Sequence, residues 1–357
     1  MEKSDVIRIK DIAAVAGVSE GTVDRVIHKR GSVSQKSRLK VEAALQEMNY
    51  TPNIYASALA FKRMKHNIVS LTPAIENSAY WQEVERGVEE AYAELKALNI
   101  NLERYYFDQN DYTTFEQAKA QILANPPQGV IFTPTFAHES IDFIDKLAEM
   151  GVGATIFDSH VESEKIVSYF GQNGVDSGRL ISKLMMMNID NGDEVLLFLP
   201  KFVGNKQSTQ IASRYSGFMD YLDSNNIKLK VTTLEIPIDD EVESLSIVIE
   251  SIKSHPKCRA MVAFNSRVFI MAEALAELKR DDIVLFGFDV LAKSVEAMKS
   301  GHVTALIGTH PRLQGYRALK SLCESVILKR DVIQYNYMPL DVLMVENINY
   351  YTTFKYQ

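Results

Sequence analysis

Polar and aromatic residues stand directly after several apolar, strand-like segments of this sequence. They are, in chain order, Ser78, Tyr80, Trp81, Asp158, His160, Asn265 and Asp289. In open α/β sheets, ligands bind beyond the carboxyl ends of the strands, where such residues would meet. Carboxylates accept hydrogen bonds from hydroxyl groups, and a flat indole ring can stack on the apolar face of a sugar. The set therefore predicts a binding site for a small carbohydrate.

Two of these residues also have structural explanations that stay open. Trp81 is the only tryptophan of the chain and lies where a strand passes into a helix, so packing in the core explains it nearly as well as stacking on a ligand. Asp158 is as compatible with the N-cap of a helix as with a ligand contact, because aspartate is a favoured N-cap residue.

The segments that would position these residues alternate between strand-like and helix-like patterns from residue 67 onward. Apolar runs such as 129–135 and 154–159 resemble buried strands, and helical patterns such as 81–98 and 139–150 separate them. Repeated β-α units predict an α/β fold with parallel sheets and helices on both faces. A second, similar series begins near Tyr169, so we expect two lobes with a cleft between them.

Three short helical patterns fill the first fifty residues. The first stops at Gly17, the second follows Ser19, and Ser34 is the expected cap of the third. The tight turn between the first two patterns has the length that sets two helices at a steep angle. Their apolar stripes are expected to close a small core of Ile9, Ile12, Val15, Ala16, Val23, Val26, Ile27, Leu39, Val41, Ala44, Leu45 and Met48.

The exposed face of the second helix is suited to the major groove of DNA. It carries Glu20, Gly21, Thr22, Asp24 and Arg25, and an arginine can hold a phosphate or the edge of a guanine. Cationic side chains that could neutralise phosphates are Lys10, Lys29, Arg30, Lys36, Arg38 and Lys40. Periodicity and charge alone leave a second interpretation open, namely a small helical subdomain that binds protein.

Charge is divided unevenly along the chain, whose formal net charge is −7 over 357 residues. Residues 1–66 hold 12 Lys and Arg against 7 Asp and Glu, whereas residues 67–357 hold 27 against 39. A basic first segment and an acidic remainder are consistent with a phosphate backbone bound at one end only.

The segment 7–60 resembles the DNA-binding head and hinge of the LacI/GalR family of bacterial repressors. Its markers are D-I-A at 11–13, A-G-V-S at 16–19, T-V at 22–23, V-S at 33–34, V-x-x-A-x-x-x-M-x-Y at 41–50 and P-N at 52–53. The resemblance implies a helix-turn-helix domain over 1–51, a hinge helix and linker over 52–66, and a homodimer on a double-stranded DNA operator. It also implies DNA contacts by Ser19, Glu20, Gly21, Thr22, Arg25 and Asn53, with Leu59 wedged into the minor groove. Ser57 replaces a usual arginine, and an ordinary linker helix remains the alternative for 53–60.

The resemblance continues more loosely through R-x-x-G-F at 214–218, F-N-S at 264–266, G-F-D at 287–289 and G-x-x-A at 315–318. It implies a periplasmic-binding-protein-like core, with one lobe over 67–168 plus 303–330 and the other over 169–302 plus 331–357. The implied effector contacts are Asn173, Arg214, Asn265, Asp289 and Thr309. Because Asn173, Ser266 and Thr309 depart from the usual residues of the family, the resemblance does not identify the effector.

Other functional classes lack their sequence signatures. We find no H-E-x-x-H, C-x-x-C, G-x-S-x-G or phosphate-loop motif, and the two cysteines are far apart, so we expect no catalytic residues, no cofactor and no metal. The charged start and the lack of about 18 consecutive apolar residues favour a cytoplasmic protein without a membrane segment. We therefore expect a ligand-responsive transcription regulator, with a sugar-binding protein or carbohydrate enzyme of the same core fold as the alternative.

Overall fold

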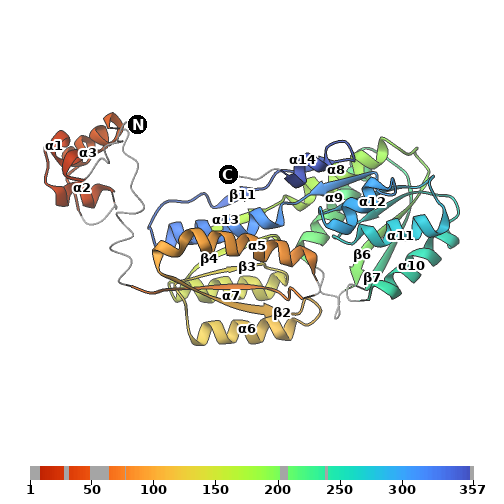
Figure 1. Cartoon of the computed structure of the whole chain (residues 1–357), viewed down its shortest axis with the longest axis horizontal. Helices are drawn as coiled ribbons and strands as arrows, with labels where there is room; N and C mark the ends of the chain where they lie inside the picture. The colour runs from red at the N-terminus through yellow and green to blue at the C-terminus, as the bar shows by residue number, and fades with distance from the viewer. Residues whose placement is uncertain are drawn as a thin grey trace. The chain divides into compact units, whose positions relative to one another are not determined.

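The structure, a computed structural model, describes residues 9–27, 32–48, 64–76, 78–201, 208–237 and 240–353 of the chain. The chain divides into two compact units, residues 1–64 and residues 65–357. The first unit is small and helical, and the second combines strands with helices (Figure 1).

The described part of the first unit consists of α1 (Ile9–Ala16), α2 (Glu20–Ile27) and α3 (Gln35–Glu47). α1 ends at Gly17, whose φ of +62° is a conformation that glycine adopts without steric cost. Ser19 begins α2, because its hydroxyl accepts a hydrogen bond from the Thr22 N–H at 3.2 Å. The buried core that the helices share is Ile12, Ala13, Ala16, Val23, Val41 and Ala44.

Two residues that we expected in this core lie outside it. Val15 is 50% exposed and Leu39 is 60% exposed. Each stands two positions from a buried residue, Ala13 or Val41, and two positions correspond to about 200° around a helix. The prediction was wrong for these two residues because the buried stripe is narrower than the apolar pattern.

The second unit contains two six-stranded sheets among its described residues. The first is parallel throughout, in the order β11-β5-β4-β3-β1-β2. Its strands are β1 (His66–Pro73), β2 (Ile100–Phe107), β3 (Gly129–Phe132), β4 (Gly153–Phe157), β5 (Ser168–Gly171) and β11 (Tyr335–Tyr337). The second has the order β12-β10-β9-β8-β6-β7 and is parallel except for the β10–β12 pair. Its strands are β6 (Glu194–Lys201), β7 (Lys230–Pro237), β8 (Cys258–Ala263), β9 (Val284–Phe288), β10 (Ala305–Gly308) and β12 (Asp341–Leu343).

Helices cover these sheets, as repeated β-α units require (Figure 1). Those of the first sheet are α5 (Ala79–Glu94) with the 3-10 turn η1 (Leu95–Leu98), α6 (Tyr112–Ala124), α7 (Ala137–Glu149) and α13 (Pro311–Val326). Those of the second are α8 (Gly174–Met186), α9 (Thr209–Ser224), α10 (Glu241–Ser254), α11 (Val268–Leu278), α12 (Ala292–Lys299) and α14 (Ile348–Thr353). None of the described helices is long and apolar enough to cross a membrane.

The described chain passes between the two sheets three times. It leaves the first sheet after β5, returns after β10 through α13, and leaves again between β11 and β12. The expected lobe bounds need correction, because β5 and β11 belong to the first sheet and β10 belongs to the second. The register gives the reason: Ala305 pairs with Phe286 of β9, and Tyr335 pairs with Tyr169 of β5.

Candidate functional site

A cavity of about 680 Å³ lies between the carboxyl ends of the strands of the two sheets. Pro73 and Phe107 line it at the ends of β1 and β2, and Pro200 lines it near the end of β6. Seven residues that the sequence singled out also line it, namely Ser78, Tyr80, Trp81, Asp158, Arg214, Asn265 and Asp289. Ligands are expected to bind beyond the carboxyl ends of parallel strands, and we call this the strand-end rule. As the rule predicts, residues more than 200 positions apart in the sequence line one cavity.

Asp158 is held at the end of β4 in a left-handed conformation, with a φ of +63°. Its N–H donates to the carbonyl of Phe170 in β5 at 3.0 Å, which fixes the backbone at this point. The hydroxyls of Tyr80 and Ser159 donate to its carboxylate at 2.5 and 3.2 Å. Burial raises the pKa of Asp158, whereas the Tyr80 hydrogen bond and the Arg214 charge lower it. The chain runs on from Asp158 into β5, so the N-cap interpretation of this residue is wrong.

Asp289 holds the corresponding position at the end of β9, with a φ of +70°. Its N–H donates to the carbonyl of Ile307 at 3.0 Å, and the Thr309 hydroxyl donates to its carboxylate. Its side chain is 3% exposed, and burial raises its pKa to about 6. Arg214 and the Thr309 hydrogen bond lower this pKa, and the negative charge of Asp158 raises it.

Arg214 projects from α9 and is 4% exposed. Its Nη1 donates to the carbonyl of Phe264 at 3.2 Å, and its guanidinium carbon lies 4.0 Å from the centre of the Phe288 ring. Its buried Nε has no hydrogen-bond partner among the described residues. Because a buried donor without a partner costs free energy, this N–H is available for an acceptor on a ligand.

The aromatic side chains of Tyr80 and Trp81 form one wall of the cavity. Ser78 caps α5 by accepting the Trp81 N–H at 3.4 Å, and this cap places the rings of Tyr80 and Trp81 in the first turn. The two rings meet edge to face with centroids 5.0 Å apart. The Trp81 Nε1 donates to Gln109 Oε1 at 3.2 Å. Trp81 is 5% exposed and lines the cavity, so it is both a packed residue and a wall of the site.

His160, Asn173 and Thr309 are not among the residues that line the cavity, whereas Asn265 is. Asn173 caps α8, since its Oδ1 accepts the Asp176 N–H at 3.2 Å. Thr309 is buried behind Asp289 and reaches the cavity through that carboxylate. Asn265 lines the cavity, and its Oδ1 accepts the N–H of Arg267 at 3.0 Å. The effector contacts of all these residues, including those that line the cavity, remain predictions.

Several further polar residues line the cavity and were not singled out from the sequence, among them Gln109, Gln210 and Arg267. Gln109 and Arg267 stand two and four residues after β2 and β8, so the strand-end rule could have found them. Gln210 stands at the start of α9, nine residues after β6, and carries no such signal.

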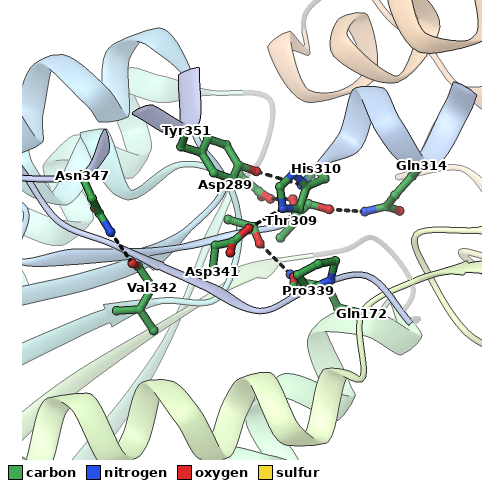
Figure 2. A network of polar contacts seen from close by, with 11 residues as sticks. Gln172, Asp289, Thr309, His310, Gln314, Pro339, Asp341, Val342, Asn347 and Tyr351 are labelled. Carbon is green, nitrogen blue, oxygen red and sulfur yellow. Dashed lines mark hydrogen bonds and ion pairs between the residues drawn. The ribbon is translucent and has the colours of Figure 1, made fainter. Parts of the chain in front are cut away.

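Gln172 links the three crossings between the lobes through hydrogen bonds. It is buried in the first crossing, and its amide donates to the carbonyls of Gly308 at 2.6 Å and Pro339 at 2.9 Å, which lie in the other two. His310 and Asp341 add a contact of 2.5 Å between the second and third crossings (Figure 2). Figure 2 also shows that Thr309 links this network to Asp289. The Thr309 side chain therefore connects the carboxylate of Asp289, which lines the cavity, to the segments that join the lobes.

α2 has the exposed polar face that DNA recognition requires. Ser19, Glu20, Gly21 and Arg25 are exposed and Thr22 is half-buried, whereas Val23 lies in the core. The Arg25 Nε donates to the carbonyl of Gly21 at 3.0 Å, which keeps the guanidinium along this face. Four of the expected phosphate-binding cations are exposed, namely Lys10, Lys36, Arg38 and Lys40. Lys29, Arg30, Asn53 and Leu59 lie outside the described residues.

The raised pKa of Asp289 predicts a pH-dependent stability of the unliganded protein. The native carboxyl titrates near 6 instead of 3.8, so the native state binds its proton more tightly than the unfolded state does. The stability contributed by this proton is complete below 3.8 and is lost as the pH rises through 6. The difference between these two pKa values corresponds to about 3 kcal/mol, and the attraction by Arg214 is already included in the value of about 6.

Asp289→Asn is therefore expected to be more stable than the wild type at pH 7.5, with an advantage that shrinks toward pH 5. The amide oxygen can still accept the Thr309 hydroxyl, and the amide carries no charge that burial would penalise at pH 7.5. Denaturant unfolding of both proteins at the two pH values measures the difference. A difference that stays constant with pH would contradict the assignment.

Comparison with known proteins places both units in known families. Residues 8–53 match the family model described as bacterial regulatory proteins, lacI family, and residues 68–327 match that of a periplasmic binding protein domain. The HTH-type transcriptional regulator DegA of Bacillus subtilis (strain 168) is 25% identical over 289 residues, which cover 79% of this chain and 81% of that protein. The ribose operon repressor of the same strain is 27% identical over 297 residues, covering 80% and 82%. A crystal structure attributed to a LacI transcriptional regulator from Bacteroides fragilis is 31% identical, has a TM-score of 0.75, and covers 81% of this chain and 100% of that one.

Proposed function

Because this chain belongs to the LacI family of bacterial regulatory proteins, we propose that it is a transcriptional repressor whose affinity for an operator is set by a sugar or sugar derivative. The observation that carries the proposal is the combination, in one chain, of the family head over 8–53 and a two-lobed core whose lobes share a polar cavity. A relative named for the ribose operon supports a sugar as the effector. We propose that the protein acts in the cytoplasm, without a cofactor or an enzymatic step.

On DNA, we propose a homodimer in which each head places α2 in the major groove of one half-site. Ser19, Glu20, Gly21, Thr22 and Arg25 would then face the bases and the adjoining phosphates. We further propose that Asn53 contacts the operator and that Leu59 opens the minor groove, as the family pattern implies. A two-fold symmetric protein of this kind requires a pseudo-palindromic operator.

The coupling between sugar and operator would pass through the crossings. A ligand that contacts Asp158 from one lobe and Asp289 from the other favours one angle between the lobes, and the three crossings must bend to reach it. Coupling free energies of about 1–3 kcal/mol, which correspond to about 5- to 150-fold in affinity, are sufficient for regulation.

Salt-sensitive retention of the full-length protein on genomic fragments of its own organism tests the proposed function. A repressor should retain a specific fragment, and one or more sugars should change that retention. A transport binding protein or a carbohydrate enzyme with the same core would retain none. Absence of retention at every salt concentration, with and without sugars, would contradict the proposed function.

Arg25→Ala is expected to lower operator affinity about 10- to 100-fold, because an arginine contact to a base or phosphate contributes about 1–3 kcal/mol. The Arg25 side chain is exposed, so thermal stability and sugar binding should not change. Lys253→Ala removes an exposed cation from α10 and serves as the control. Fluorescence anisotropy with a labelled operator measures all three proteins, and equal affinity of Arg25→Ala and wild type would remove Arg25 from the interface.

A further inference from the structure

The charged groups that line the cavity give a ligand with negative charge no advantage. Among the described lining residues, two carboxylates and two guanidinium groups are at least half-buried, and three further carboxylates are exposed at the rim. The inner groups are Asp158, Asp289, Arg214 and Arg267, and the rim groups are Glu76, Asp108 and Glu241. A phosphate or carboxylate would therefore pass acidic side chains and meet no surplus of positive charge inside.

The two inner carboxylates are equivalent positions of the two lobes. β4 and β9 are each third from the edge in their sheets, and they lead into Phe157-Asp158 and Phe288-Asp289. Both aspartates have a positive φ, both donate their N–H to the neighbouring strand, and both accept a hydroxyl, from Tyr80 or from Thr309. The repeated geometry brings one carboxylate from each lobe to the same cavity.

Two carboxylates that face one cavity repel each other unless hydrogen-bond donors lie between them. Arg214 attracts both, so its single positive charge is already shared between two negative ones. A ligand can therefore use the acceptor capacity of Asp158 and Asp289 and the buried N–H donor at the Arg214 Nε. Hydroxyl groups satisfy all three, because a hydroxyl both donates and accepts.

We propose that the cavity takes a polyhydroxylated ligand that carries neither phosphate nor carboxylate, held between Asp158 of one lobe and Asp289 of the other. This inference rests on the proposed function and narrows its effector to uncharged sugars and related polyols. Their hydroxyls donate to both carboxylates, and the apolar face of the ring lies against Trp81 or Tyr80.

Matched ligand pairs test the inference on the full-length protein. We would compare ribose with ribose 5-phosphate, glucose with glucose 6-phosphate and glucuronate, and galactose with galacturonate, by thermal shift and then by calorimetry. At least one uncharged member should bind, and its charged counterpart should bind about 100-fold more weakly, because its negative charge is repelled by the carboxylates of the cavity. Equal or tighter binding of a charged member overturns the inference, as does the failure of every uncharged member.

Two variants separate a direct role of the carboxylates from a structural one. Asp158→Asn and Asp289→Asn should each weaken the uncharged ligand and also reduce the preference over its charged counterpart, since each removes one repelling charge. A purely structural role would weaken both ligands equally and leave the preference unchanged. Glu149→Gln removes an exposed charge on α7, outside the cavity lining, and should change neither quantity.

DNA retention measured on the same preparations keeps this inference separate from the proposed function. If a charged sugar binds and releases the operator, the proposed repressor function is supported and the inferred preference for an uncharged ligand is contradicted. If the uncharged sugar is preferred but no genomic fragment is retained, the charge inference stands and the repressor fails.

Discussion

Gly178→Ala is expected to lower the free energy of unfolding of the core by about 2–4 kcal/mol. A Cβ at Gly178 in α8 would lie 1.9 Å from the carbonyl oxygen of Arg214 and 2.8 Å from its carbon in α9. These are backbone atoms, so no side-chain rotation can relieve the contact. The helix propensity of alanine favours the substitution by about 1 kcal/mol, which is too little to offset the clash. Differential scanning calorimetry or denaturant unfolding of the full-length protein measures the loss.

The same substitution should also weaken sugar binding. α9 must move away from α8 to admit the methyl group, and Arg214 moves with it out of its position against Phe288. Gly21→Ala is the control, because the nearest atom to a Cβ there is the end of the Arg25 side chain at 3.8 Å. That variant should keep the stability of the head or raise it slightly. If Gly178→Ala is as stable as wild type and binds sugar equally well, the close helix contact does not constrain the site.

The general fold followed from local patterns in the sequence. Three apolar stripes predicted α1, α2 and α3, and alternating patterns predicted most strands and helices of the core, because periodicity depends on neighbours along the chain. The lobe bounds did not follow, since the four-residue strand β10 and the three-residue strand β11 are assigned by their pairing partners. The sequence also did not indicate that Gly178 makes a close helix contact, because that contact depends on which helix packs against it.

Most of the candidate site also followed from the sequence, for a topological reason. Parallel strands end at the same edge of a sheet, so Asp158 and Asp289 had to lie near a common cleft once two lobes were expected. Gln210 could not be found in this way, because it reaches the cavity from the start of a helix. The role of Gln172 was also hidden, since both carbonyls that it contacts lie more than 130 residues away.

Gln172→Met is expected to separate sugar binding from DNA release. Methionine has a similar length but donates no hydrogen bond, so the carbonyls of Gly308 and Pro339 lose their shared donor. The stability should fall by about 2 kcal/mol, because buried acceptors are left without partners. The first crossing should then move independently of the other two, which His310 and Asp341 still join, and the ratio of operator affinities without and with sugar should fall toward one. Anisotropy titrations of the operator at zero and saturating sugar measure that ratio.

Gln334→Met distinguishes this uncoupling from a general loss of stability. The Gln334 amide also donates to two backbone carbonyls, those of Glu164 at 3.1 Å and Ile166 at 3.0 Å, but both belong to the loop between β4 and β5 of the first sheet. Its loss removes two amide-to-carbonyl bonds at less buried positions and leaves the Gln172 bonds among the crossings in place. We expect the variant to lose stability and to retain the wild-type ratio of operator affinities. If both variants changed the ratio equally, flexibility of the core would explain the coupling and Gln172 would have no special part in it.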